Sequence, residues 1–231
     1  MSSVSIVIPA YNEAQCIGST LAAVRSWAHD AECIVVDDGS CDETSSMAEQ
    51  YVDQLIRLSH NCGKGFALQI GWQAAKGDVL LQLDADLAES AGHAWQLLVP
   101  VQAGECDMAI AIFPQPEERI GLGLAKGLAE KGIRLLTGFH ASAPLSGQRA
   151  IRKEVLQATK RLDHGFGVEV GLTVDALRAG YTIKEVPVPF KHRLTQNDWK
   201  GYLHRGREFV AVGRALGRKW REGSALPTCQ R

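Results

Sequence analysis

Two carboxylates one residue apart, Asp84 and Asp86, follow a short apolar run at residues 79–83. A run of this length predicts a buried strand, so both side chains are expected at its carboxyl end, where open α/β sheets bind ligands. Mg²⁺ in proteins is usually held by one or two carboxylates together with substrate phosphates. The pair therefore indicates a divalent cation that holds a diphosphate, and a solvated turn at the end of a strand is the plain structural alternative.

Three other loops carry residue types that suit a nucleotide. Residues 9–13 (Pro-Ala-Tyr-Asn-Glu) combine an aromatic ring with a helix start, where a base can stack and a phosphate can meet free amides, although Asn12 as a helix cap is the alternative. Residues 37–40 (Asp-Asp-Gly-Ser) offer a carboxylate to a base imide or a ribose hydroxyl. Residues 61–65 (Asn-Cys-Gly-Lys-Gly) are glycine-rich and basic, but they match neither a P-loop nor a dinucleotide fingerprint. An ATPase or a dehydrogenase is therefore not indicated.

Alternating strands and helices must position these loops. Short β-branched or apolar runs predict strands at 4–8, 33–36, 55–58 and 79–83, and apolar periodicity near 3.6 predicts helices between them. Repeated strand–helix units are typical of an α/β fold with a mainly parallel, doubly wound sheet flanked by helices. The ligand loops are then expected along one edge of that sheet.

Composition narrows the function classes. The 231 residues are 45% hydrophobic, enough for one α/β domain over residues 1–231 or for two closely packed halves. The net charge is −1, with ten Lys and Arg against three Asp and Glu in residues 191–231, so the chain carries no overall nucleic-acid signature. Six cysteines without a Cys-x-x-Cys pair favour reduced thiols in a cytoplasmic protein and argue against structural zinc. We expect no N-terminal leader with a basic and an apolar part. We also expect no membrane span, because no apolar run approaches the ~18 residues that one needs.

The loop segments, taken together, resemble a known family. Residues 5–13, 35–40, 61–65 and 83–86 occur in the order and approximate spacing of the family 2 glycosyltransferases with a GT-A fold. The blocks at 145–150, 165–172 and 185–189 are similar to those of dolichyl/polyprenyl-phosphate sugar transferases and glucosyl-3-phosphoglycerate synthases. The resemblance covers most of residues 4–195, and it implies a GT-A nucleotide-diphospho-sugar transferase fold.

The resemblance also implies roles for single residues. A divalent cation, Mg²⁺ or Mn²⁺, would be held by Asp86, with Asp84 on the ribose or the cation and His192 as a further ligand. Arg149 and Arg193 would neutralise the leaving diphosphate, although a surface histidine and surface salt bridges are the plain alternatives for these three residues. The nucleotide pocket would be lined by Pro9, Ala10, Tyr11, Glu13, Asp38 and Lys64.

Glu169 is the candidate general base, and Asp163 is the second candidate. A sugar hydroxyl is a poor nucleophile at neutral pH, so a carboxylate must take its proton during attack on the anomeric carbon. A polyprenyl phosphate is already anionic, in which case Glu169 would orient the acceptor or a metal-bound group. A carboxylate at a helix start is also favoured by the helix dipole, which is the structural alternative. Single displacement would invert the anomeric centre, whereas the phosphoglycerate enzymes share this block and retain configuration.

The C-terminal segment predicts an amphipathic basic helix from Trp199 to Arg221. A helix that packs on the domain and shows its charges to water is the plain interpretation. Contact with an anionic membrane surface is the sharper one, and it would suit a lipid-phosphate acceptor. The expected apolar or small stripe is Tyr202, Gly206, Phe209, Gly213, Leu216 and Trp220, beside a basic face of Lys200, His204, Arg207, Arg214, Arg218 and Arg221.

We therefore expect a nucleotide-sugar-binding half at about 1–110, an acceptor half at about 111–195 and a basic helix and tail at about 196–231. The expected function is metal-dependent transfer of a hexose, with inversion, from a UDP-sugar, or alternatively a GDP-sugar, to a lipid phosphate or small polar acceptor. A polyprenyl- or dolichyl-phosphate mannosyl- or glucosyltransferase is the first alternative. A nucleotide-binding module and a sugar-phosphate nucleotidyltransferase follow, although residues 9–13 lack the Gly-rich, basic first loop of the latter. The expected location is the cytoplasm, with peripheral membrane contact as an option.

Overall fold

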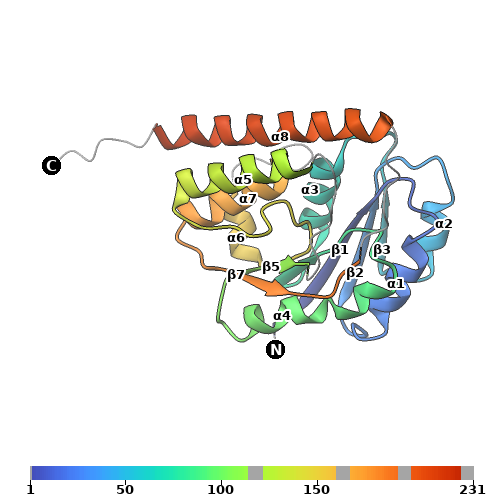
Figure 1. Cartoon of the computed structure of the whole chain (residues 1–231). Coiled ribbons are helices and arrows are strands. Elements are labelled where there is room, and N and C mark those ends of the chain that lie inside the picture. Colours follow the sequence, from blue (N-terminus) through green and yellow to red (C-terminus); the bar gives the residue numbers. More distant parts are fainter. Residues whose placement is uncertain (1, 114–121, 160–166, 192–198, 225–231) are drawn as a thin grey trace.

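The computed structural model describes residues 2–113, 122–159, 167–191 and 199–224 (Figure 1). Its centre is a seven-stranded sheet of order β3-β2-β1-β4-β6-β5-β7. All neighbouring strands are parallel except β6, which runs antiparallel to both β4 and β5. The strands are β1 (Val4–Ala10), β2 (Glu32–Asp37), β3 (Gln54–Arg57), β4 (Val79–Gln82), β5 (Met108–Ile112), β6 (Arg149–Arg152) and β7 (Ile183–Pro187).

Helices cover both faces of the sheet (Figure 1). One face carries α1 (Ile17–Arg25), α2 (Thr44–Glu49), the 3₁₀ helix η1 (Ala88–His93) and α4 (Trp95–Gln102). The other face carries α3 (Lys64–Ala74), α6 (Lys153–Ala158) and α7 (Gly167–Arg178), with α5 (Leu122–Thr137) and α8 (Trp199–Ser224) packed outside α7.

Strand β1 shows how the sequence builds these layers. Successive side chains of a strand point to opposite faces, so Ile6 and Ile8 join the core beneath α1, while Val7 joins the core beneath α3. A strand buried on both faces reads as a continuous apolar run, as β1 does. A Cβ at Gly71 of α3 would lie 2.4 Å from Val7 Cγ1, so the glycine lets α3 approach the strand closely.

The predicted α/β fold, with a mainly parallel sheet flanked by helices and a C-terminal helix, is confirmed. Among its members with described side chains, the apolar stripe expected on the C-terminal helix is buried only at Leu216. Phe209 and Trp220 are 42% and 54% exposed, whereas the described part of α8 buries a face formed by Val212, Ala215, Leu216 and Lys219. The cause is contact with α5 and α7, which selects that face.

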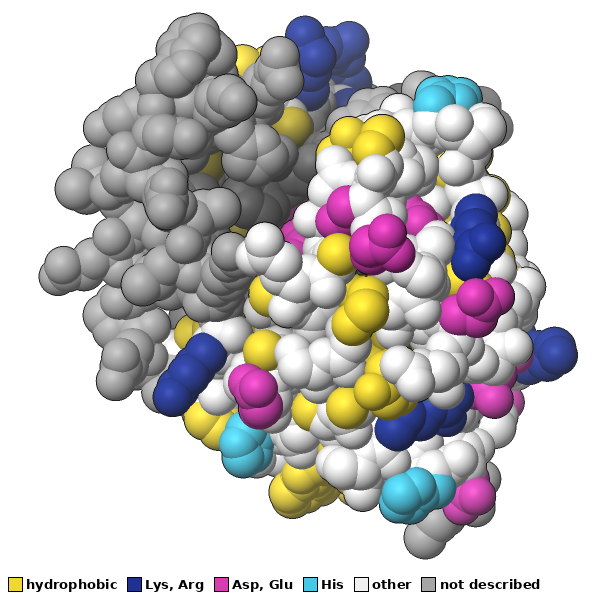
Figure 2. All heavy atoms as spheres, turned by 90° about the vertical axis from the view of Figure 1, so that its right-hand side faces the viewer, with side chains coloured by type: hydrophobic (Ala, Val, Ile, Leu, Met, Phe, Trp, Pro, Cys, Tyr) yellow, Lys and Arg dark blue, Asp and Glu magenta, His cyan; other side chains and the backbone are white. Residues whose placement is uncertain are grey.

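Among the described helices, none combines the length and the apolar composition that crossing a bilayer requires. Figure 2 shows one face of the molecule, where the described acidic and basic side chains are interspersed. On this face the described residues therefore form no continuous basic surface of the kind that nucleic acids require.

Candidate active site

The loops that follow β1 and β2 are tied to each other. The backbone N–H of Asn12 donates to Ser40 Oγ at 2.9 Å, and the N–H of Cys41 donates to Asn12 Oδ1 at 2.9 Å. Asn12 has a positive φ of 55°, which asparagine tolerates better than most residues. Helix α1 has Cys16 as its N-cap residue, so Asn12 joins the two loops and does not cap that helix.

Asp38 fixes the glycine-rich loop at residues 61–65. Its Oδ1 accepts the N–H of Cys62 at 2.7 Å, and its Oδ2 accepts the N–H of Gly63 at 2.8 Å. The residue is 3% exposed. Gly39, next to it, has a φ of +74°, and a Cβ there would lie 2.5 Å from the carbonyl carbon of His60. The loops after β2 and β3 are therefore packed backbone to backbone, and the expectation that Asp38 meets a base stays a prediction.

Lys64, the first residue of α3, joins two carboxylates that are far apart in the sequence. Its Nζ lies 2.9 Å from Asp84 Oδ1 and 2.9 Å from Glu169 Oε1. Burial alone would lower the pKa of Lys64, but the charges of Asp84 and Glu169 raise it above its usual value. Lys64 is therefore a fixed ammonium ion at neutral pH, beside the end of β4.

Glu169 lies in the first turn of α7, as expected, but its side chain is fully buried. Neither carboxylate oxygen has a hydrogen bond of good geometry within the described part of the chain. The contact with Lys64 is an ion pair, which tolerates poor angles better than a hydrogen bond does. The ion pair is thus the main compensation for burying this charge.

Asp84 is held from the opposite side as well. Gln148 Nε2 donates to Asp84 Oδ2 at 2.7 Å. The antiparallel register explains the contact, because Gln82 of β4 pairs with Arg149 of β6, which places residues 147 and 148 beside the end of β4. The sequence interpretation gave Gln148 no role, and its place in the block at 145–150 was the available signal.

Arg149 lies inside the protein and does not face the ligand loops. Its Nε donates to the carbonyl oxygen of Ser146 at 2.8 Å, and its Nη1 donates to Thr173 Oγ1 at 2.9 Å. Burial lowers the pKa of Arg149 to about 10, against the opposing effect of Glu169 and Glu185. Contact with a diphosphate would require Arg149 to leave these bonds.

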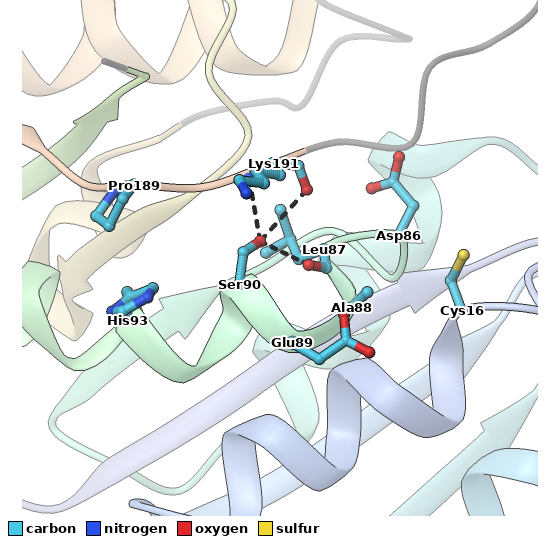
Figure 3. Close-up of a pocket in the computed structure, with 9 residues that line it drawn as sticks. All are labelled: Cys16, Asp86, Leu87, Ala88, Glu89, Ser90, His93, Pro189 and Lys191. Carbon is cyan, nitrogen blue, oxygen red and sulfur yellow. Dashed lines mark hydrogen bonds between the residues drawn. The ribbon is translucent and has the colours of Figure 1, made fainter. Parts of the chain in front are cut away.

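Asp86 borders a cavity of ≈ 430 Å³ between η1 and the segment that follows β7 (Figure 3). That segment is joined to η1 by the N–H of Lys191, which donates to Ser90 Oγ at 3.0 Å. A volume of this size is within the range of small-ligand pockets. The lining residues are Cys16, Asp86, Leu87, Ala88, Glu89, Ser90, His93, Pro189 and Lys191.

The residues present fit a divalent cation that a diphosphate also binds. Within the described ranges, no three His, Cys, Asp or Glu side chains are grouped as a metal site. Mg²⁺ needs only one or two carboxylates when phosphates and waters complete its shell, and Asp86 at the cavity is one, whereas the two oxygens of Asp84 already contact Lys64 and Gln148. Asp163, His192 and Arg193 lie outside the described residues.

Comparisons with known proteins define the class. The model of the family "Glycosyl transferase family 2" matches residues 5–158, more than half of the chain. The chain is 29% identical over 99% of its length to glycosyltransferase AglD of Haloferax volcanii, of which it spans 38%. It is also 29% identical over 81% of its length to the undecaprenyl-phosphate mannosyltransferase of Micrococcus luteus, of which it spans 83%.

A solved structure shares the fold. Glucosyl-3-phosphoglycerate synthase of Mycobacterium tuberculosis, in complex with Mn²⁺, UDP-glucose and phosphoglyceric acid, superposes with a TM-score of 0.78 at 26% identity, over 94% of this chain and 80% of that one. The same enzyme was also solved with Mg²⁺ and UDP. The protein is thus a glycosyltransferase with a GT-A fold. It belongs to glycosyl transferase family 2.

Proposed function

We propose that this glycosyltransferase moves a hexose from a UDP-sugar to an acceptor in a reaction that depends on Mg²⁺ or Mn²⁺. The observation that carries the proposal is the Lys64 ammonium, 2.9 Å from both Asp84 and Glu169 and on the loop that Asp38 anchors. A diphosphate with its cation needs fixed positive charge beside carboxylates, and this arrangement supplies both. The UDP-glucose and Mn²⁺ of the structural neighbour support the choice of donor and cofactor.

Asp86 would hold the cation, with Asp84 beside it and His192 as a further ligand. The bound cation would supply charge to stabilise the leaving diphosphate. Lys64 adds a positive charge whose position is fixed, and Arg193 would add a second. The nucleotide itself would lie on the loops after β1, β2 and β3, against Pro9, Ala10, Tyr11, Glu13 and Asp38.

Glu169 would act as the general base for a hydroxyl acceptor, with Asp163 as the second candidate. Its carboxylate already lies 2.9 Å from the Lys64 ammonium. Because its side chain is buried, an acceptor hydroxyl would have to enter the protein beside Lys64 to reach it. Attack by that hydroxyl in a single displacement would invert the anomeric centre.

A lipid phosphate is the second candidate acceptor, and one surface favours it. Helices α5 and α8 pack side by side, and five apolar side chains on them are 42–75% exposed. Exposed Lys131, Arg134, Arg214 and Arg221 lie on the same two helices. Exposed apolar and basic side chains on one pair of packed helices suit an anionic lipid surface, and exposed Glu222 on α8 opposes it. We call this the α5–α8 surface; its apolar members are Leu124, Leu135, Phe209, Val210 and Trp220.

A thermal-shift panel tests the donor and the cation. A ligand that binds only the folded protein raises its unfolding temperature, by an amount that grows with concentration. We expect UDP and UDP-hexoses with Mn²⁺ or Mg²⁺ to stabilise the protein, and GDP, CDP and TDP sugars to do so less. Stabilisation by a GDP-sugar alone would mean that the donor is a GDP-sugar. Equal stabilisation by UDP with and without a cation would contradict the dependence on Mg²⁺ or Mn²⁺. Release of UDP with undecaprenyl phosphate, but not with soluble acceptors, would select the lipid.

A further inference from the structure

The segment just before β6 lies directly against the Lys64–Asp84 ion pair. Gly147 is the closest point: a Cβ built on it would lie 2.7 Å from Lys64 Nζ and 2.9 Å from Asp84 Oδ2. Its carbonyl oxygen accepts a hydrogen bond from Gln82 Nε2 at 2.9 Å, and this bond fixes the segment to β4. A side chain at residue 147 would make this ion pair shift.

Gln148 is fully buried and bonds the second oxygen of the same carboxylate. Ionised Asp84 can only accept hydrogen bonds, so the amide must turn its nitrogen towards Asp84. The amide oxygen is then left to accept Ser146 Oγ, at 3.4 Å. Asp84 therefore receives an ammonium ion on one oxygen and an amide on the other, and its plane is fixed by both.

The charge of residue 148 matters as much as its hydrogen bond. Lys64 contacts Asp84 and Glu169, and buried Arg149 is affected by the charges of Glu169 and Glu185. A neutral hydrogen-bond donor at residue 148 adds no charge to this group. A carboxylate there would face Asp84 at hydrogen-bond distance, and two such carboxylates share a proton because both cannot ionise easily.

We propose that Gln148 is a positioning residue for donor binding. It holds Asp84 in the orientation that keeps Lys64 between Asp84 and Glu169, so it acts on the donor without touching it. This inference rests on the proposed function of Lys64 and Asp84 as part of the UDP-sugar site.

The test uses Gln148→Glu and Gln148→Leu in the full chain, with UDP and Mn²⁺ as probes in calorimetric titrations between about pH 5 and pH 8. Gln148→Leu removes the hydrogen-bond donor to Asp84, and we expect UDP to bind on the order of 10- to 100-fold more weakly at every pH. Gln148→Glu is expected to bind as weakly at the upper pH. It should recover as the pH falls, because a protonated carboxyl donates to Asp84 as the amide does.

Exposed Gln102 at the end of α4 provides the control, because Gln102→Glu makes the same chemical change far from the pair and should leave UDP binding unchanged. A purely structural defect would not recover at low pH. The proposal is overturned if Gln148→Leu binds UDP as the native protein does, or if Gln148→Glu shows no recovery. Should native protein itself not bind UDP, the proposed donor is wrong, and the two failures are therefore distinguishable.

Discussion

Lys64 Nζ lies 2.9 Å from Glu169 Oε1, although the two residues are more than 100 positions apart in the chain. The same nitrogen is equally close to Asp84 Oδ1. Lys64 is thus shared between the carboxylate at the end of β4 and the carboxylate at the start of α7. Because the three groups are in contact, substitutions of them are expected to have non-additive effects on stability and binding.

The Glu169→Gln variant distinguishes two roles of Glu169, as a general base and as a residue that only holds Lys64 in place. The variant keeps the size of the side chain and removes its charge, so a general base should lose about 10²–10⁴ in turnover at saturating donor. UDP affinity should fall much less, because Asp84 still holds Lys64. Steady-state kinetics and UDP titration measure the two effects. An equal loss of turnover and of UDP affinity would mean that Glu169 only holds Lys64 in place and is not a base.

Asp86→Ala tests the cation. The side chain borders a cavity and not the core, so we expect an unchanged unfolding temperature, loss of transfer and loss of the contribution of Mn²⁺ to UDP binding. The readouts are thermal unfolding, turnover and UDP titration with and without Mn²⁺. His192→Ala, made alongside, should shift the Mn²⁺ concentration needed for activity. Turnover close to native in Asp86→Ala would remove Asp86 from the cation site.

Lys219→Met tests how α8 is attached. The Lys219 side chain is fully buried, and its Nζ contacts Asp175 of α7 at 2.5 Å and Glu222 at 3.3 Å. Its removal leaves the mostly buried Asp175 without this partner, and breaking a buried pair from one side typically costs about 3–5 kcal/mol. Denaturant unfolding measures the loss. In the double variant with Asp175→Leu most of the stability should return, and a double variant as unstable as the single one would contradict this account.

Vesicle binding tests the α5–α8 surface. The protein should co-sediment with vesicles that contain phosphatidylglycerol, and less so as salt rises, because each Lys or Arg near an anionic surface adds only about 1 kcal/mol of screened attraction. Neutral vesicles should bind little. Changing Lys131, Arg134 and Arg214 to Gln should remove the binding, and Arg57→Gln, on the distant edge strand β3, should not.

Two other results would reassign that surface. No binding to anionic vesicles at low salt would favour a soluble acceptor. A dimer in light scattering that Trp220→Ser abolishes would assign the α5–α8 surface to a second copy of the chain.

Local sequence signals predicted the first half of the fold well. Asp84 and Asp86 stand after β4 as expected, because a short apolar run followed by polar residues is decided within a few positions of the chain. The contact of Lys64 with Glu169 could not be predicted in this way. It depends on the order of the strands and on where α7 begins, and neither is encoded near either residue.

The buried face of α8 shows a different limit. Small and apolar residues occur on two sides of this helix, so periodicity alone does not tell which side faces the domain. The packed side includes Lys219, whose charge argued for exposure. A buried lysine becomes predictable only when its partner, Asp175 on another helix, is known to lie opposite.

The antiparallel strand β6 also governs how the chain can fold as it is made. Within the described residues, β5 pairs only with β6 and β7, so residues 108–112 have no neighbouring strand until residues 149–152 have been synthesised. Until then β4 has one unpaired edge, and an unpaired edge invites association with other chains. Nascent chains that end between these positions are therefore the ones we expect to depend most on chaperones, and a truncation there is expected to aggregate.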